Sequence, residues 1–189
     1  MDQDDPRQLL IKVAEILDRL NIPYMITGGI AVLVWGRPRF TADIDVIVEL
    51  KPEHIDKLEI ALHQLSSVGY IDKDAMEEAL SRHGEFNFID GSTGMKVDFW
   101  ILSKDSFDAS RLKRRIAKEI LGQKVYFISP EDLILSKLRW YQKSQSTRHL
   151  EDAESVIKVS GGKLDVQYLK TWAEKQGTFS VLGRFLSAR

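Results

Sequence analysis

Hydrophobic residues recur at helical spacing at the start of the chain and through its last third. After Asp5 and Pro6, which suit a helix cap and a first turn, apolar positions repeat every three or four residues up to Leu20. This spacing predicts an amphipathic helix there. The same reasoning predicts helices at 30–35, 52–65, 74–83, 130–143, 148–159 and 165–176, with a short one at 180–186.

Short apolar or alternating runs predict strands at 24–27, 40–48, 86–89 and 95–102, the last two joined as an antiparallel hairpin. Residues 114–120 fit a helix as well as a strand, but the Gly122 turn and the run Val125–Ile128 favour a second hairpin. The pattern therefore indicates an α/β (α+β) fold: a sheet domain over 1–128 and a helical C-terminal region over 129–189.

Composition narrows the class of protein. The 189 residues carry 27 Lys+Arg against 28 Asp+Glu, a net charge of -1 that excludes a simple basic nucleic-acid binder. With no cysteine, any metal must bind oxygen or nitrogen, and a reducing compartment is expected. The longest apolar run, 30–35, is too short to span a membrane, so we expect a soluble cytoplasmic protein with no membrane partner.

Charge is nevertheless uneven along the chain. Residues 43–90 hold 12 acids and 4 bases, net -8, whereas residues 104–148 hold 11 bases and 5 acids, net +6. The two segments could face each other across a cleft, or they could be two solvated surfaces of opposite sign.

Asp43 and Asp45 flank Ile44 in the strand 40–48. The two-residue period of a strand places both carboxylates on one face, with Cα atoms about 6–7 Å apart. Carboxylates so placed can share a Mg²⁺ ion, although a lone pair of this kind is also common on an edge strand.

Asp98 interrupts the apolar run 97–102. A buried carboxylate needs a cation, which a metal or an ordinary ion pair with Lys96 could supply.

Gly28 and Gly29 lie between a predicted strand and a predicted helix, where backbone N–H groups can receive an anion, or where they simply form a tight turn. If the chain is extended over 37–45, Arg37, Arg39 and Thr41 share the face of the two acids and could reach phosphate oxygens.

Lys137 falls inside the apolar arc of the helix 130–143, so it either extends to the surface along its packed stem or binds nucleotide phosphates. Arg148 and Asp152, four residues apart, fit a helix-surface pair.

The joint order of these features is specific. A strand, Gly28-Gly29, residues 30–42, Asp43-Ile44-Asp45 and a later Asp98 resemble the nucleotidyltransferase superfamily with the polymerase β-like fold. The runs GGIAVLVWGRPRFTADIDVIV, FNFIDGSTGMKVDFWIL and ISPEDLILSKLRWYQ are most similar to minimal nucleotidyltransferases grouped with AbiEii toxins of type IV toxin-antitoxin systems, over residues 24 to about 157.

The resemblance implies a site and a reaction. Asp43, Asp45 and Asp98 would be catalytic and would bind Mg²⁺ or Mn²⁺, while Gly28 and Gly29 would bind the nucleotide. Lys137 is a further predicted nucleotide ligand, because the resembling families often carry a lysine in this helix, and Arg39 is another, from the face that it would share with the acids. The expected activity is transfer of a nucleoside monophosphate from an NTP such as ATP to a hydroxyl, with pyrophosphate released.

The acceptor would be RNA such as tRNA, a protein side chain, or a small molecule such as an aminoglycoside, and an antitoxin protein would be a further partner. The alternative is a non-catalytic nucleotide-binding or toxin-antitoxin regulatory protein of the same fold.

Overall fold

The structure is a computed structural model that describes residues 5–187, which form two compact units. One unit comprises residues 5–30 and 41–127, and is called the sheet unit here. The other comprises residues 31–40 and 128–187, and is called the helical unit.

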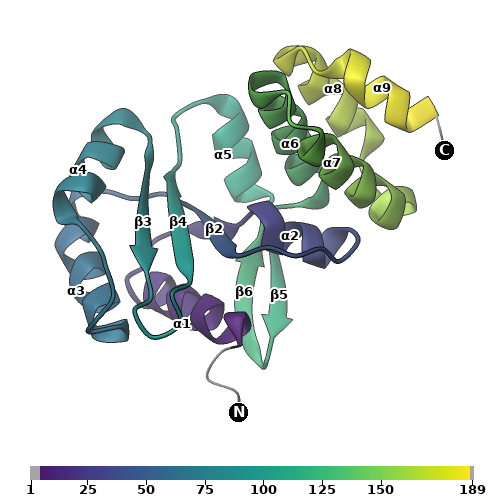
Figure 1. The fold of residues 1–189 in the computed structure, drawn as a ribbon. Helices are drawn as coiled ribbons and strands as arrows, with labels where there is room; N and C mark the ends of the chain where they lie inside the picture. The colour runs from purple at the N-terminus through teal and green to yellow at the C-terminus, as the bar shows by residue number, and fades with distance from the viewer. Residues whose placement is uncertain (1–4, 188–189) are drawn as a thin grey trace. The chain divides into compact units, whose positions relative to one another are not determined.

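The sheet unit is built on a mixed six-stranded sheet (Figure 1), which confirms the predicted fold class. The spatial order is β3-β4-β2-β1-β6-β5. The pairs β2/β4 and β1/β6 are parallel, and the remaining neighbours are antiparallel. The strands are β1 (Tyr24–Ile26), β2 (Asp43–Val48), β3 (Glu85–Ile89), β4 (Lys96–Ile101), β5 (Ile116–Ile120) and β6 (Gln123–Phe127).

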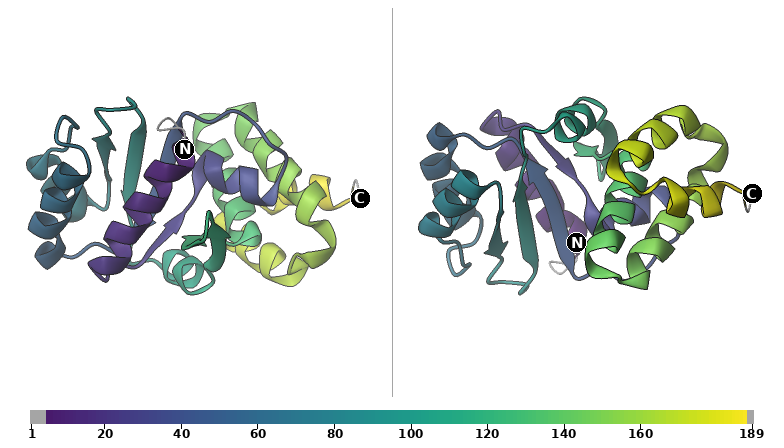
Figure 2. Two further views of the ribbon diagram at one scale, coloured as in Figure 1. Left: turned by 90° about the horizontal axis from the view of Figure 1, so that it is seen from below. Right: turned by 90° about the horizontal axis from the view of Figure 1, so that it is seen from above.

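Helices complete the sheet unit. Asp5 accepts a hydrogen bond from the Arg7 amide and caps α1 (Pro6–Arg19), whose fully buried Val13 and Leu17 supply apolar surface to the core. Helix α1 packs on α3 and on β6, and it runs across the sheet in Figure 2. The other helices are the 3₁₀ turn η1 (Pro52–His54), α3 (Ile55–Leu65), α4 (Lys73–Arg82) and α5 (Ser106–Lys113).

The helical unit begins where the Ser129 hydroxyl accepts a hydrogen bond from the Asp132 amide and caps α6. Helix α6 packs on both α7 and α8. The elements are α6 (Pro130–Ser144), α7 (Thr147–Ser160), the 3₁₀ turn η2 (Gly161–Lys163), α8 (Val166–Gln176) and α9 (Phe179–Ser187).

Helix α2 (Gly28–Trp35) begins in the sheet unit and ends in the helical unit, where the Trp35 indole donates to the Ile128 carbonyl.

The second hairpin is confirmed, since β5 and β6 pair antiparallel around Leu121 and Gly122. The predicted strand 40–48 is too long, because β2 begins at Asp43. Helix α5 was not predicted; Asp105 caps it by accepting from the Asp108 amide.

Candidate active site

Strand register places the three predicted acids on one face of two neighbouring strands of the sheet unit. In the parallel pair β2/β4, Asp45 lies opposite Asp98 and Asp43 lies opposite Lys96. Neighbouring strands are about 4.8 Å apart, and partners in register point to the same face. All four side chains are half-buried, whereas Ile44 and Val97 between them are buried on the other face.

The face continues onto β3, which pairs with the other side of β4. Asn87 lies opposite Asp98, and Glu85 lies opposite Trp100. The pKa of Glu85 is raised, mainly by burial and further by repulsion from Asp98 and Asp45. Lys96 acts in the opposite direction and lowers this pKa, but by less. This group of polar side chains on β2, β3 and β4 is called the acidic face below.

One cation already contacts the acidic face. The Lys96 ammonium lies 2.9 Å from Oδ2 of Asp98, and this hydrogen bond raises the pKa of Lys96. The ion pair that the sequence offered as the ordinary explanation of Asp98 is therefore present, beside the other two acids.

The two glycines allow close approach of side chains from β2 and the segment before it. Gly28 begins α2 with φ +59°, and a Cβ there would overlap the Asp45 carboxylate. A Cβ on Gly29 would overlap the Thr41 side chain, whose hydroxyl lies 3.5 Å from the Asp43 carbonyl. Glycine at both positions therefore lets Asp45 and Thr41 lie against the first turn of α2.

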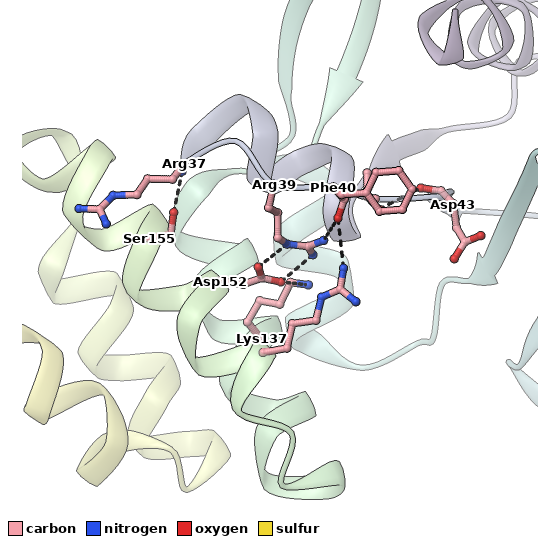
Figure 3. A network of polar contacts seen from close by, with 9 residues as sticks. Arg37, Arg39, Phe40, Asp43, Lys137, Asp152 and Ser155 are labelled. Atoms are coloured by element: carbon pink, nitrogen blue, oxygen red, sulfur yellow. Dashed lines mark hydrogen bonds and ion pairs between the residues drawn. The ribbon is translucent and has the colours of Figure 1, made fainter. Parts of the chain in front are cut away.

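Arg39 and Lys137, the other two predicted nucleotide ligands, lie in the helical unit, where both bind Asp152 (Figure 3). Arg39 donates from Nε and Nη2 to the two Asp152 oxygens at 2.6 and 2.9 Å, and the Lys137 ammonium lies 2.8 Å from Oδ2. Burial raises the pKa of Asp152, but the hydrogen bonds from Arg39 and Lys137 outweigh burial, and the net pKa is below its usual value.

Two sequence predictions are corrected by this network. Arg39 does not extend β2, because the polar groups of 37–40 are satisfied within the helical unit: the Arg37 amide donates to Ser155, and Arg39 binds Asp152. Asp152 is not part of a helix-surface pair, since only 2% of it is exposed. Arg148 instead donates to the Phe40 carbonyl, as Arg39 also does.

The sequence contained one signal for Asp152 that was not used. An acid at that position of α7 falls among the buried residues Ala153, Val156 and Ile157, and Lys137 falls among the apolar residues of α6. Two opposite charges on apolar helix faces are best explained as partners of each other.

The donor set of the acidic face fits a hard divalent cation. Three carboxylates from adjacent strand positions supply the oxygen ligands that Mg²⁺ prefers. In the conformation described for residues 5–187, no three His, Asp or Glu side chains are grouped closely enough to hold a metal ion. Asp98 is held by Lys96 in this conformation.

Residues 7–178 match the family described as nucleotidyl transferase of unknown function (DUF2204). The chain belongs to this nucleotidyl transferase family. A search of curated proteins finds no match.

Solved structures share the fold of this nucleotidyl transferase at low sequence identity. An antigenic nucleotidyltransferase-like protein from Paracoccidioides brasiliensis aligns with a TM-score of 0.57 and 22% identity over 100% of this chain and 95% of that one. ANT(2")-Ia, in complex with adenylyl-2"-tobramycin, aligns with a TM-score of 0.58 and 18% identity over 91% and 97%. The lincosamide antibiotic adenylyltransferase LnuA, lincomycin-bound, gives 0.53 and 11% over 82% and 97%.

No helix within residues 5–187 of the nucleotidyl transferase is long and apolar enough to cross a membrane.

Proposed function

We propose that this nucleotidyl transferase moves a nucleoside monophosphate from an NTP, such as ATP, to a hydroxyl acceptor with release of pyrophosphate. The observation that carries the proposal is the register of β2 and β4, which sets Asp45 opposite Asp98 and two residues from Asp43. Gly28 has no Cβ, so the Asp45 carboxylate can lie against it, and Gly28 is also the first residue of α2. The start of this helix therefore lies beside the acids.

Each group has a role in this reaction. Asp43, Asp45 and Asp98 would hold Mg²⁺ or Mn²⁺, and the first turn of α2 at Gly28 and Gly29 would receive the triphosphate through its N–H groups. When bound, such cations favour the deprotonated acceptor oxygen and neutralise charge on the leaving pyrophosphate.

The bond changes balance without a nucleophilic side chain. The acceptor oxygen bonds to the α-phosphorus, the bond to the bridging oxygen breaks, and pyrophosphate leaves with that electron pair. Asp98, on the middle strand of the acidic face, would help to accept the hydroxyl proton.

Arg39 and Lys137 stay predicted nucleotide ligands. Each would meet a phosphate as a cation already hydrogen-bonded to Asp152, whose contacts fix the positions of both side chains.

For the acceptor we propose an RNA hydroxyl, as the resemblance to AbiEii-type toxins suggests. The support is the basic segment 104–148, net +6, which favours a polyanion. On the same resemblance, an antitoxin protein is the proposed partner.

The test is incubation with each α-³²P-labelled NTP, Mg²⁺ or Mn²⁺, and total cellular RNA. The Asp43→Asn protein is the control, because it removes one charge from the acidic face without changing the size of the side chain.

Label in RNA that is lost in the variant supports the proposal. Label that appears only when an aminoglycoside is supplied replaces RNA with a small-molecule acceptor. No transfer from any NTP, with nucleotide binding retained, favours the non-catalytic alternative.

A further inference from the structure

Lys96 is the one basic residue contributed by β2, β3 and β4, and it belongs to the acidic face. The other charged side chains of that face are Asp43, Asp45, Asp98 and Glu85. One ammonium therefore shares the face with four carboxylates: it lies 2.9 Å from Asp98, and Lys96 lies opposite Asp43 in the strand register.

Carboxylates on adjacent strands repel one another, and an internal cation reduces that repulsion. The raised pKa of Glu85, due to burial and then to Asp98 and Asp45, shows that the repulsion reaches β3. The Lys96 ammonium is thus a positive charge of the chain itself beside an acid of the proposed metal site.

The two cations compete for the same atom. Mg²⁺ binds carboxylate oxygens at about 2.1 Å, and Oδ2 of Asp98 already receives the ammonium at 2.9 Å. An ammonium and a divalent cation on the same carboxylate would repel each other, and solvent screens this repulsion only in part, since 40% of the Lys96 side chain and 15% of the Asp98 side chain are exposed.

We propose that Lys96 is a positioning residue that acts as a tethered counter-cation: it neutralises Asp98 in the metal-free protein and competes with the divalent cation for the Asp43, Asp45 and Asp98 site. The inference rests on the proposed function, because it assumes that these acids bind metal. It adds a device that limits metal affinity and stabilises the acidic face before metal binds.

The experiment compares Lys96→Met with wild type. Methionine keeps much of the apolar stem and removes the charge, and Lys96→Gln provides a second neutral side chain if methionine impairs folding. Lys96→Arg keeps the cation.

The matched control is Lys73→Met, which breaks the Lys73–Asp56 pair elsewhere in the sheet unit. The Lys73 side chain is 42% exposed, against 40% for Lys96, and both substitutions to methionine change the net charge by the same amount.

Two properties are measured without nucleotide or acceptor. The first is Mn²⁺ affinity by titration calorimetry or electron paramagnetic resonance, and the second is the melting temperature in EDTA and in Mg²⁺. We expect Lys96→Met to bind Mn²⁺ at least about fivefold more tightly than wild type. We also expect its melting temperature to fall in EDTA and to recover in Mg²⁺, with Lys96→Arg and Lys73→Met close to wild type in metal affinity.

The outcomes separate this inference from the proposed function. Mn²⁺ binding that is equal in wild type and Lys96→Met, or weaker in the variant, overturns the role of Lys96 and leaves the metal site standing. Tighter binding in Lys73→Met as well would also overturn it, since net charge alone would then explain the change. No Mn²⁺ binding by any of the proteins overturns this inference, and the labelled-NTP assay decides the proposed function separately, because substrate phosphates complete such a metal site.

Discussion

Two Asp–Lys pairs in this protein have nearly the same geometry and opposite surroundings. Asp98 and Lys96 in the sheet unit lie 2.9 Å apart, and Asp152 and Lys137 in the helical unit lie 2.8 Å apart. The first pair has 15% and 40% of its side chains exposed, and the second has 3% and 9%. Asp152 meets two cations, whereas Lys96 meets an excess of carboxylates.

The difference separates an acid whose charge the chain itself neutralises from a face that keeps a negative balance. Asp152 receives two hydrogen bonds from Arg39 and an ion pair from Lys137, so the buried acid is neutralised by the chain itself. The acidic face has more negative charge than its lysine neutralises, and it is partly open to solvent. A partly exposed group of carboxylates on one face is what a metal-dependent reaction requires.

The largest expected effect is on the acidic face. Asp45→Asn should lower nucleotidyl transfer at least about a thousandfold, because it removes a ligand charge that is worth several kcal/mol in the transition state. The melting temperature should stay near that of wild type, since the variant relieves repulsion among acids. Labelled-NTP transfer and thermal unfolding measure both. Normal transfer by the variant would refute the assignment of Asp45.

The corresponding change in the helical unit should act on stability. Asp152→Asn leaves Arg39 and Lys137 without their shared counter-charge, and breaking a buried pair costs about 3–5 kcal/mol. Urea unfolding measures the loss. The conservative comparison is Glu78→Gln, which breaks the exposed pair with Arg82 and should change the free energy of unfolding by less than about 1 kcal/mol. Equal effects of the two substitutions would remove the distinction between the clusters.

Gly28→Ala tests the contact between α2 and the acidic face. The positive φ alone costs roughly 1–2 kcal/mol for a residue with a Cβ, and overlap with Asp45 adds to it. Gly94→Ala is the control, because Gly94 has φ +70° and a Cβ added there would have no neighbouring atom within 4 Å. Transfer should fall in Gly28→Ala only. Equal losses of stability in the two variants would mean that Asp45 moves aside at no cost.

The smallest effect concerns pH. The pKa of Asp152 is lowered in the folded protein, so its contribution to stability is present above its unfolded pKa of about 3.9 and is lost as pH falls through the lower folded value. Urea midpoints between pH 7 and pH 3 should therefore fall more steeply in wild type than in Asp152→Asn. Parallel curves would show that another group governs acid unfolding.

Local patterns predicted most of the elements and part of the site. The period of two placed Asp43 and Asp45 on one face, and both hairpins were predicted from their turns. The predicted strand start at Phe40 was wrong, since β2 begins at Asp43. An alternating pattern cannot show that Arg37 and Arg39, just before it, find partners on α7. Helix α5 was missed, since it has few buried positions: Phe107, Asp108 and Leu112.

The sequence by itself determined what nearest neighbours decide: helix caps at Asp5 and Ser129, the shared face of Asp43 and Asp45, and the glycine pair where α2 begins. Only the tertiary structure decided which distant residues meet. Asp45 faces Asp98 because buried side chains such as Ile44 and Val97 set the register of two parallel strands. Arg39 meets Asp152, 113 positions away, because a buried charge must be paired with whichever opposite charge the fold brings within reach.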